Sequence, residues 1–566
     1  MNASRPPRPS TGPRAWWAGP WWQLVLILAA CGTVYWVGLG WGGLHSTEGH
    51  RVIPGREILR TGDWLVTSMF GQPYLRKPPG MPWAIAVSTW LFGPSVWSAR
   101  AVSALAATAM ALVAWRSTRA WFGPAGGLAA GLASALLPWF WESGRAAEIE
   151  ALNTLGAQLA ALPLLTLLLR RPGHGVASAR SARSAMLVAA IGVALAGLAK
   201  GPALLPLLLG VLGAGAIVAG PRAALSARVW VPLLAGGAAV GAVYAAIWWR
   251  VAARDLSPVT QSPSAFAFEP GALLRVAMLP AAAFVASMPA SLAVVFPWGP
   301  NAAKERTTRA GRPTPRLRFA RALAWAWVLT LAVSMVFGLS NVRYTLPAAV
   351  LLPPLVGYVV ATHRRGMTPP RAAIARAMLL GRAWAWAPVL LIGAAVYVAT
   401  VEAGRRSSSG RDAGRAIAAR LLELAPERPL TIAADQAIEA RPETLLSARA
   451  ALERAWGEPG VRVRWVPGLS GPVSRASGTT AYLLRWDGRV SERWAAERVG
   501  VDDPERAEWT GIVHDYRFVL CLGEPPENEA RENADAAPAR PPPGGVHAIF
   551  TKLPGGSRAW GVVPQP

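Results

Sequence analysis

Long apolar stretches constrain this chain more than any other feature. A helix needs about 20 mostly apolar residues to cross roughly 30 Å of hydrocarbon, and soluble domains rarely contain many such runs. The sequence has about eleven stretches close to that length. They run over residues 22–42, 101–115, 125–142, 149–169, 185–199, 203–219, 229–249, 277–298, 322–338, 344–362 and 384–401. We therefore expect a polytopic α-helical membrane protein.

One further apolar run, residues 81–92, is bounded by Pro78-Pro79 on one side and Gly93-Pro94 on the other. Because these boundaries leave too few residues for a span, the sequence predicts a helix lying at the membrane interface. Composition supports the overall class, since 53% of the residues are hydrophobic and 16% charged. Such a composition excludes a disordered chain.

The net charge of +26 is confined to the apolar part of the chain. Residues 1–402 hold 35 Lys or Arg against 10 Asp or Glu, whereas residues 403–566 hold 22 against 21. Basic residues in short loops resist translocation and so orient a membrane protein. The basic excess is explained by topology, and we expect no nucleic-acid partner.

The loop charges predict an orientation. With residues 1–20 in the cytoplasm, the inner segments hold 23 Lys or Arg and the outer ones 12. An odd number of spans then places residues 403–566 outside, which predicts a multi-pass protein of the plasma (inner) membrane. Nine of the ten acidic residues before residue 403 fall on or next to the outer face. Any chemistry is therefore expected to face outward.

The last part of the chain differs in pattern. Residues 403–566 alternate helical periodicity with short strand-like runs, which predicts a small extracytoplasmic α/β domain. Within it, residues 524–545 are rich in Pro, Glu, Ala and Asn, a composition typical of a flexible segment. Residues 21–402 form the expected transmembrane domain.

The long outer loop, residues 43–100, carries the most specific motifs. It contains an acid before a short helix, then Gly62-Asp63-Trp64, Gly71-Gln-Pro-Tyr74 and Lys77-Pro-Pro79. Arg145-Ala-Ala-Glu148-Ile-Glu150 and Lys200-Gly-Pro202 follow, and Arg343-Tyr344 comes later. This order resembles glycosyltransferase family 39, the multi-spanning polyprenyl-phosphate-sugar transferases that include aminoarabinose lipid A transferases and protein O-mannosyltransferases. The resemblance covers roughly residues 20–360.

The resemblance implies an integral-membrane glycosyltransferase that moves a sugar from a polyprenyl-phosphate donor to an acceptor on the outer face. The acceptor could be a lipid, a protein or a polysaccharide, and membrane lipids are further partners. A carboxylate would act as general base, and cations would stabilise the departing phosphate. No cofactor and no metal are expected. His45 and His50 resemble an inverted zinc-protease motif, but the extra Gly49 spoils the required helical spacing.

The family's catalytic Asp corresponds to Thr47 in this sequence, and the adjacent acid is Glu48. This departure leaves three readings open. Glu48 could have taken over as the catalytic base, which we favour. It could instead be an acid that complements a helix dipole, or the chain could be a non-catalytic relative.

Other site residues follow from the same resemblance. Lys77 is assigned to the donor phosphate, and Arg51 is either a second phosphate ligand or an interfacial side chain. Glu148 and Glu150 could bind the sugar or pair with Arg145. The remaining assignments are Lys200 and Arg343 to the donor phosphate, and Tyr344 and Tyr74 to the substrate.

A transporter or flippase of lipid-linked sugars is the alternative from another functional class, because it too could use an outward cationic pocket. Transporters often contain internal repeats and charged groups on both sides of the midplane. The sequence has no such repeat, and its polar groups gather on one face. These features favour the transferase.

Overall fold

The computed structural model describes most of the chain up to residue 363 and selected elements after it. Described are residues 19–44, 47–70, 72–169, 175–254, 272–298 and 313–363, then 392–393, 395–397, 399–400, 410–424, 430–435, 442–456, 461–466, 480–486, 509–513, 516–522 and 560–561. The predicted flexible segment, residues 524–545, lies outside the described residues.

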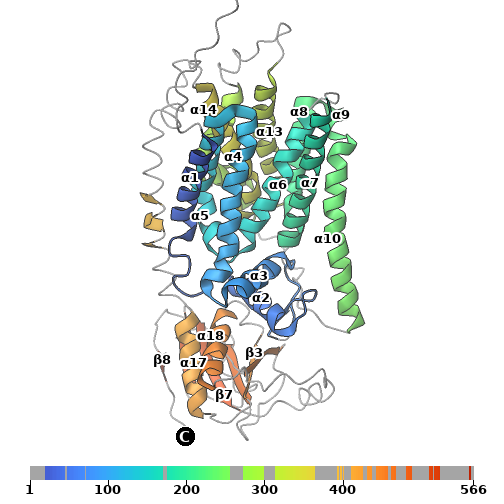
Figure 1. Cartoon of the computed structure of the whole chain (residues 1–566). Helices are drawn as coiled ribbons and strands as arrows, with labels where there is room; N and C mark the ends of the chain where they lie inside the picture. The colour runs from blue at the N-terminus through green and yellow to red at the C-terminus, as the bar shows by residue number, and fades with distance from the viewer. Residues whose placement is uncertain are drawn as a thin grey trace, which may run out of the picture.

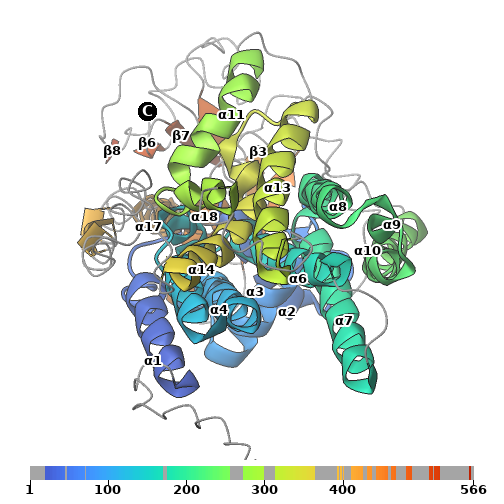
Figure 2. The same ribbon diagram turned by 90° about the horizontal axis from the view of Figure 1, so that it is seen from above.

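Long helices form a bundle in the first two thirds of the chain (Figure 1). Its long helices are α4 (Val96–Ala135), α6 (Ile149–Leu169), α7 (Gly175–Lys200), α8 (Leu205–Ala219), α10 (Ala227–Ala253), α11 (Ala272–Ala286) and α13 (Pro315–Val336). Shorter helical segments complete it: α1 (Pro20–Cys31), η2 (Gly32–Trp36), α5 (Pro138–Arg145), η3 (Gly201–Leu204), α9 (Pro221–Ala224), η5 (Ala290–Trp298), η6 (Val342–Leu351) and α14 (Leu352–His363). Seen from above, α10 lies at the periphery beside α9, with α7 and α8 nearby (Figure 2).

The chain is a multi-pass membrane protein, but about eleven spans are not found among the described residues. Six helical segments are long and apolar enough to cross a membrane, or seven if the bent pair Leu274–Ala286 and Ala290–Trp298 counts as one span. Two of the six, Val96–Ala135 and Arg180–Ala219, are 40 residues long and each joins two predicted spans. Each contains a glycine with positive φ, Gly123 or Gly201. The predicted span at 384–401 lies largely outside the described residues.

Small residues allow the helices of the bundle to pack closely. At the contact of α6 and α7, a Cβ on Gly156 would lie 2.6 Å from the backbone nitrogen of Ala196. A Cβ on Gly192 would lie 2.4 Å from the nitrogen of Ala160. Backbones approach this closely only where both helices carry small residues. This contact fixes α6, which begins at the site described below.

The first long loop, which carries α2 (Gly49–Thr61) and α3 (Gly80–Phe92), forms a layer across one end of the bundle (Figure 1). It also contains a two-residue hairpin of β1 (Ser68–Met69) and β2 (Gln72–Pro73). The helix α3 has 13 residues, too few to span the bilayer. Trp90, Leu91 and Phe92 at its end are exposed. This agrees with the prediction that residues 81–92 lie at the interface.

The C-terminal part lies at the same end of the bundle as this loop (Figure 1). It contains the helices α17 (Gly410–Leu424) and α18 (Pro442–Trp456). Its strands are β3 (Leu430–Asp435), β4 (Val461–Val466), β5 (Thr480–Trp486), β6 (Trp509–Val513), β7 (Tyr516–Leu522) and β8 (Trp560–Gly561). They form one sheet in the order β4-β3-β5-β7-β6-β8, in which β3 is parallel to both neighbours and the other pairs are antiparallel. An independent extracytoplasmic α/β domain stays a prediction.

An ion pair joins the C-terminal part to the first loop. Nη1 of Arg449, on α18, lies 2.9 Å from Oε1 of Glu57, on α2, and both side chains are buried. Arg60 also lies 3.2 Å from the other oxygen of Glu57. The partners are 392 residues apart in sequence, so the contact is not visible in any local pattern.

We expect Arg449→Ala to loosen this junction. A buried hydrogen bond between charged groups contributes about 1.5–3 kcal/mol, and Arg60 still compensates part of the Glu57 charge. The undocked population should rise about tenfold to a hundredfold. Limited proteolysis of the C-terminal part measures this rise, with the exposed Arg454→Ala on the same helix as matched control. Equal cleavage rates in the two variants would contradict a docking role for Arg449.

Candidate active site

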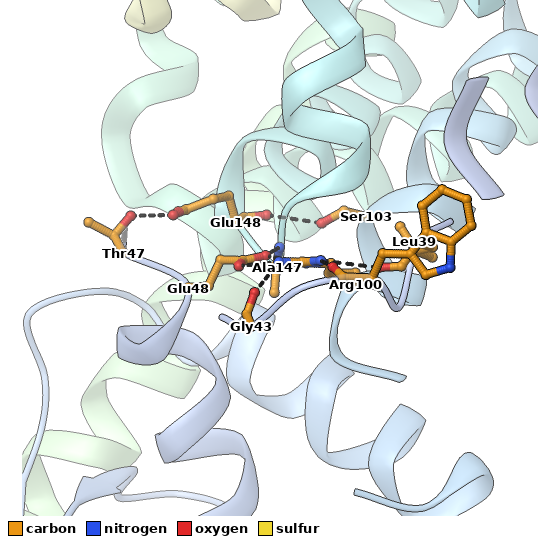
Figure 3. Close-up of polar contacts among 9 residues, drawn as sticks. Leu39, Gly43, Thr47, Glu48, Arg100, Ser103, Ala147 and Glu148 are labelled. Carbon is orange, nitrogen blue, oxygen red and sulfur yellow. Dashed lines mark hydrogen bonds and ion pairs between the residues drawn. The ribbon is translucent and has the colours of Figure 1, made fainter. Parts of the chain in front are cut away.

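Glu48 lies at the start of α2 but does not cap that helix. Its Oε1 accepts hydrogen bonds from Nε of Arg100 at 2.8 Å and from the backbone nitrogen of Ala147 at 2.7 Å. Its Oε2 accepts from Nη2 of Arg100, also at 2.8 Å. The residue is 1% exposed. Figure 3 shows this carboxylate held between the two donors.

Arg100 holds the loop that leads to Glu48. It is completely buried near the start of α4, and all five of its N–H groups have acceptors. Besides Glu48, the acceptors are the backbone carbonyls of Leu39, Trp41 and Gly43. An arginine provides five donors in a fixed plane, so this one side chain defines the path of residues 39–48.

Beside the Arg100–Glu48 ion pair lies a cavity of about 150 Å³. Its walls come from the first loop, α5, the start of α6 and η6. The lining residues are Thr47, Glu48, Trp139, Glu142, Ser143, Ala146, Glu148, Glu150, Arg343 and Leu346. Four of the ten are acids, which is unusual for a space at the end of an apolar bundle.

Glu148 immediately precedes α6, and its side chain meets the first loop. The hydroxyl of Thr47 donates a hydrogen bond to its Oε1 (Figure 3). Burial raises the pKa of the Glu148 carboxyl to about 7. The charge of Arg51 and the Thr47 hydrogen bond oppose this rise in pKa, whereas the nearby Glu150 and Glu48 add to it. Near neutral pH this group can therefore both take up and release a proton.

Glu150 faces cations from two other elements. Its Oε1 accepts from Nζ of Lys200 at 2.9 Å, and Nε of Arg343 lies 4.0 Å from the same oxygen. Nζ of Lys200 also lies 4.8 Å from the ring centroid of Tyr344, a cation–π distance. The Oε2 of Glu150 is buried and has no hydrogen-bond partner among the described residues.

Lys77 belongs to a group of cations. Burial, together with the surrounding positive charges, lowers the pKa of its ammonium group to about 8. Those charges belong to Arg51, Lys200, Arg343 and Arg76. We call Lys77 and these four residues the cation cluster. Glu150 compensates part of this charge through Lys200 and Arg343, and the remaining excess of cations favours an anionic ligand.

Two predicted residues are more deeply packed. Arg51 is 5% exposed; its Nη1 donates to the carbonyl of His50 at 3.3 Å, and its Nε has no hydrogen-bond partner among the described residues. The ring of Tyr74 stacks on that of His50 with centroids 6.2 Å apart. Tyr74 is buried and does not line the cavity. Its position suits support of the loop better than contact with substrate.

Part of the chain matches a known protein family. Residues 76–249 match the family described as dolichyl-phosphate-mannose-protein mannosyltransferase. The chain carries a glycosyltransferase family 39 domain. The matched stretch includes Lys77, Arg100, Glu148, Glu150 and Lys200, and it begins after Thr47 and Glu48. The resemblance predicted from the loop motifs is thereby confirmed.

Individual relatives match a shorter stretch of the chain. One is the undecaprenyl phosphate-α-4-amino-4-deoxy-L-arabinose arabinosyl transferase 2 of Pseudomonas fluorescens, 34% identical over 113 residues, which are 20% of this chain and 19% of that one. The corresponding transferase of Serratia proteamaculans is 35% identical over 71 residues, 11% of this chain and 13% of its own. The chain therefore matches a fifth or less of the length of either relative.

Solved structures share the fold of this chain. The crystal structure of ArnT from Cupriavidus metallidurans in the apo state has a TM-score of 0.56 and 18% identity, covering 88% of this chain and 97% of that chain. The same protein bound to undecaprenyl phosphate has a TM-score of 0.51 and 20% identity, covering 76% and 85%. At these identities the likeness concerns the fold.

The structure brings most of the predicted site residues to one end of the bundle. Lys200, Arg343, Tyr344 and Glu150 are in contact, and Lys77 and Arg51 share the cation cluster. Glu148 pairs with Thr47, and not with Arg145, whose Nη1 donates to the carbonyl of Val34 at 2.9 Å. Among the described residues, no group of His, Cys, Asp and Glu is arranged to hold a metal ion.

Glu48 is the predicted residue that the geometry fits least well. Both of its oxygens already accept hydrogen bonds within an ion pair, so it has little capacity to take a proton from a substrate. Arg100 was not among the residues predicted from the sequence. The sequence does mark it, because Arg100 is a charged residue immediately before the apolar run 101–115. An ionisable residue at that position suggests a partner in the protein.

Proposed function

We propose that this protein is an integral-membrane glycosyltransferase that moves a sugar from a polyprenyl-phosphate donor to an acceptor on the outer face of the membrane. The observation that carries this proposal is the cation cluster next to a cavity lined by carboxylates. The first would bind the phosphate of the donor, and the second would hold the sugar and the acceptor. The relatives named for undecaprenyl phosphate sugars support the class of donor.

The cation cluster suits a lipid phosphate in particular. Lys77 lies in the first outer loop and Arg343 at the start of η6, so the charges converge at the end of the apolar bundle, where a lipid headgroup would lie. The buried Nε of Arg51 lacks an acceptor among the described residues, and a phosphate oxygen could supply one. We assign Lys77, Arg51 and Arg343 to the phosphate.

The same arrangement suits the departure of that phosphate. When the acceptor attacks the anomeric carbon, the bond from that carbon to the phosphate oxygen breaks, and the phosphate gains negative charge. Fixed ammonium and guanidinium groups in a poorly hydrated site stabilise such charge strongly. Lys200 bridges the two regions, because it contacts Glu150 and belongs to the cation cluster. We assign Glu150 and Tyr344 to the sugar.

Orientation is part of the proposal. We propose that the first loop and the C-terminal part face outward from the plasma (inner) membrane, with residues 1–20 in the cytoplasm. The first loop and the C-terminal part lie at the same end of the bundle, which supports placing both on one side of the membrane (Figure 1). The loop charges support a cytoplasmic location for residues 1–20. A reporter fused after residue 410 should be active only in the extracytoplasmic space, and cytoplasmic activity there would contradict this orientation.

The decisive experiment is a transfer assay on the purified full chain in lipid nanodiscs. Polyprenyl-phosphate sugars are offered singly with a mixed extract of lipid, peptide and polysaccharide acceptors, and release of free polyprenyl phosphate is measured. We expect stoichiometric release and labelling of one acceptor. Movement of intact donor between leaflets without release would instead identify a transporter or flippase. If neither release of polyprenyl phosphate nor movement of the donor is observed, the proposed function is contradicted.

The titration of Lys77 predicts how donor binding depends on pH. With a pKa of about 8, the Lys77 ammonium is charged below pH 8 and loses its charge above it. A phosphodiester keeps its negative charge over this range, so the KM for the donor should rise as pH increases through about 8. Lys77→Arg should lack this rise because a guanidinium stays protonated. An unchanged KM between pH 7 and 9 in the parent protein would contradict the assignment.

A further inference from the structure

The three innermost carboxylates of the cavity are in different chemical situations. Both oxygens of Glu48 are engaged by Arg100 and Ala147. One oxygen of Glu150 is engaged by Lys200, and the other is unpaired among the described residues. Among the described residues, the Glu148 carboxylate accepts a single hydrogen bond, from the hydroxyl of Thr47. Of these three carboxylates, Glu148 therefore has the most capacity to accept a proton.

We propose, as an extension of the proposed transferase activity, that Glu148 is the catalytic base and that the acceptor is an uncharged alcohol. The hydroxyl oxygen of the acceptor forms the new bond to the anomeric carbon, and the hydroxyl proton passes to Glu148. The electron pair of the broken bond leaves on the donor phosphate, so atoms and charge balance without another reactant.

The position of Glu148 explains how this site works without an Asp at residue 47. Thr47 and Glu148 come from elements 101 residues apart and meet at the cavity wall (Figure 3). The carboxylate is thus supplied from the start of α6, while the first loop supplies a hydroxyl that orients it. The backbone carbonyl of Glu148 is held in turn by the hydroxyl of Ser103 at 3.3 Å. Thr47 is a positioning residue in this arrangement.

Charge distribution argues for an alcohol over a phosphate as acceptor. The cavity is lined by four acids, Glu48, Glu142, Glu148 and Glu150, and by one cation, Arg343. Glu48 and Glu150 are paired with Arg100 and Lys200, so repulsion of an anionic acceptor would come mainly from Glu142 and Glu148. The cation cluster is already required for the donor phosphate. An alcohol has the proton that a base must remove, whereas an ionised phosphate has none. The unpaired Oε2 of Glu150 can accept a hydrogen bond from a further hydroxyl of a sugar.

The charge state of Glu148 adds a pH dependence. Its pKa of about 7 reflects burial, opposed by Arg51 and Thr47 and reinforced by Glu150 and Glu48. Below pH 7 the carboxyl is protonated and cannot act as a base, so kcat/KM should fall about tenfold per pH unit there. The Thr47 hydrogen bond lowers this pKa. Its loss should therefore raise the pKa and move the fall in kcat/KM to higher pH.

The first test compares two acceptors of equal chain length, n-dodecyl β-D-maltoside and n-dodecyl phosphate, with the polyprenyl-phosphate sugar that the full chain uses in nanodiscs. We expect sugar transfer to the maltoside and none to the phosphate. Transfer to dodecyl phosphate at an equal or greater rate overturns the inference and leaves the proposed function standing. Transfer to neither acceptor, with no release of polyprenyl phosphate, contradicts both.

The second test uses Glu148→Gln, which keeps the shape but cannot take a proton. Transfer to the maltoside should fall at least about a hundredfold. Azide is an anionic nucleophile with no proton to lose, so it needs no base. Added sodium azide should therefore form a glycosyl azide and restore release of polyprenyl phosphate in this variant. Unchanged transfer to the maltoside, or a loss that azide does not restore, assigns Glu148 a structural role and overturns the inference.

The third test separates positioning from folding at residue 47. Thr47→Ser retains the hydroxyl and should keep the pH profile of the parent protein. Thr47→Val removes the hydroxyl at nearly constant volume and should shift the acid limb of kcat/KM to higher pH. Identical profiles in both variants would overturn the positioning role.

Discussion

Lys77→Ala should reduce kcat for sugar transfer by about 10²–10³, which corresponds to about 2.7–4 kcal/mol of lost transition-state stabilisation. The physical reason is the position of Lys77 within the cation cluster. Its ammonium group would meet the phosphate oxygen on which charge develops as the sugar departs. Because this charge is larger in the transition state than in the bound donor, kcat should fall more than donor affinity.

Single-turnover release of polyprenyl phosphate by the full chain in nanodiscs measures this effect. Lys77→Arg should retain part of the rate, since a cation remains, but not all of it, since a guanidinium places its donors differently. Arg222→Ala is a matched control, because Arg222 is an exposed cation on α9 at the opposite end of the bundle (Figure 1). A reduction of less than about threefold in Lys77→Ala would rule out direct contact with the leaving phosphate.

The sequence predicted the membrane class and the resemblance to glycosyltransferase family 39, because these depend on local patterns. The roles of the site residues stay predictions. Lys77 lies in a Lys-Pro-Pro motif and Lys200 in Lys-Gly-Pro, and both belong to the cation cluster of the structure. The count of about eleven spans is not confirmed among the described residues. Hydropathy separates two apolar runs near Gly123, and the backbone of α4 is itself non-helical at that glycine.

The choice between Glu48 and Glu148 could not be made from spacing alone. The resemblance implies that Thr47 stands where the family has an Asp, and the adjacent Glu48 was the obvious substitute. Which acid is free to act depends on contacts across the fold: Arg100 reaches Glu48 from 52 residues away, and Glu148 reaches Thr47 from 101 residues away. A sequence shows that Arg100 is an isolated charge but does not show which acid it neutralises.

Arg100→Met should destabilise the protein by about 3–5 kcal/mol, because it leaves the Glu48 carboxylate buried without its counter-ion. Three backbone carbonyls of residues 39–43 would lose their donor at the same time. The thermal unfolding midpoint of the full chain in detergent should fall, and the cavity should lose its shape. Arg100→Lys should restore only part of this stability, since one ammonium group cannot make five hydrogen bonds in a plane.

Glu48→Gln then distinguishes a structural Glu48 from a catalytic one. The amide nitrogen of Gln would face a donor, either Arg100 or the backbone nitrogen of Ala147, so one hydrogen bond becomes a repulsive contact. A structural role therefore predicts a lower unfolding midpoint together with lower activity, and an acid limb still near pH 7 in the remaining activity. A catalytic role predicts an unchanged midpoint and loss of the acid limb. Because Glu148→Gln should show the second pattern, the two variants identify the base by opposite outcomes.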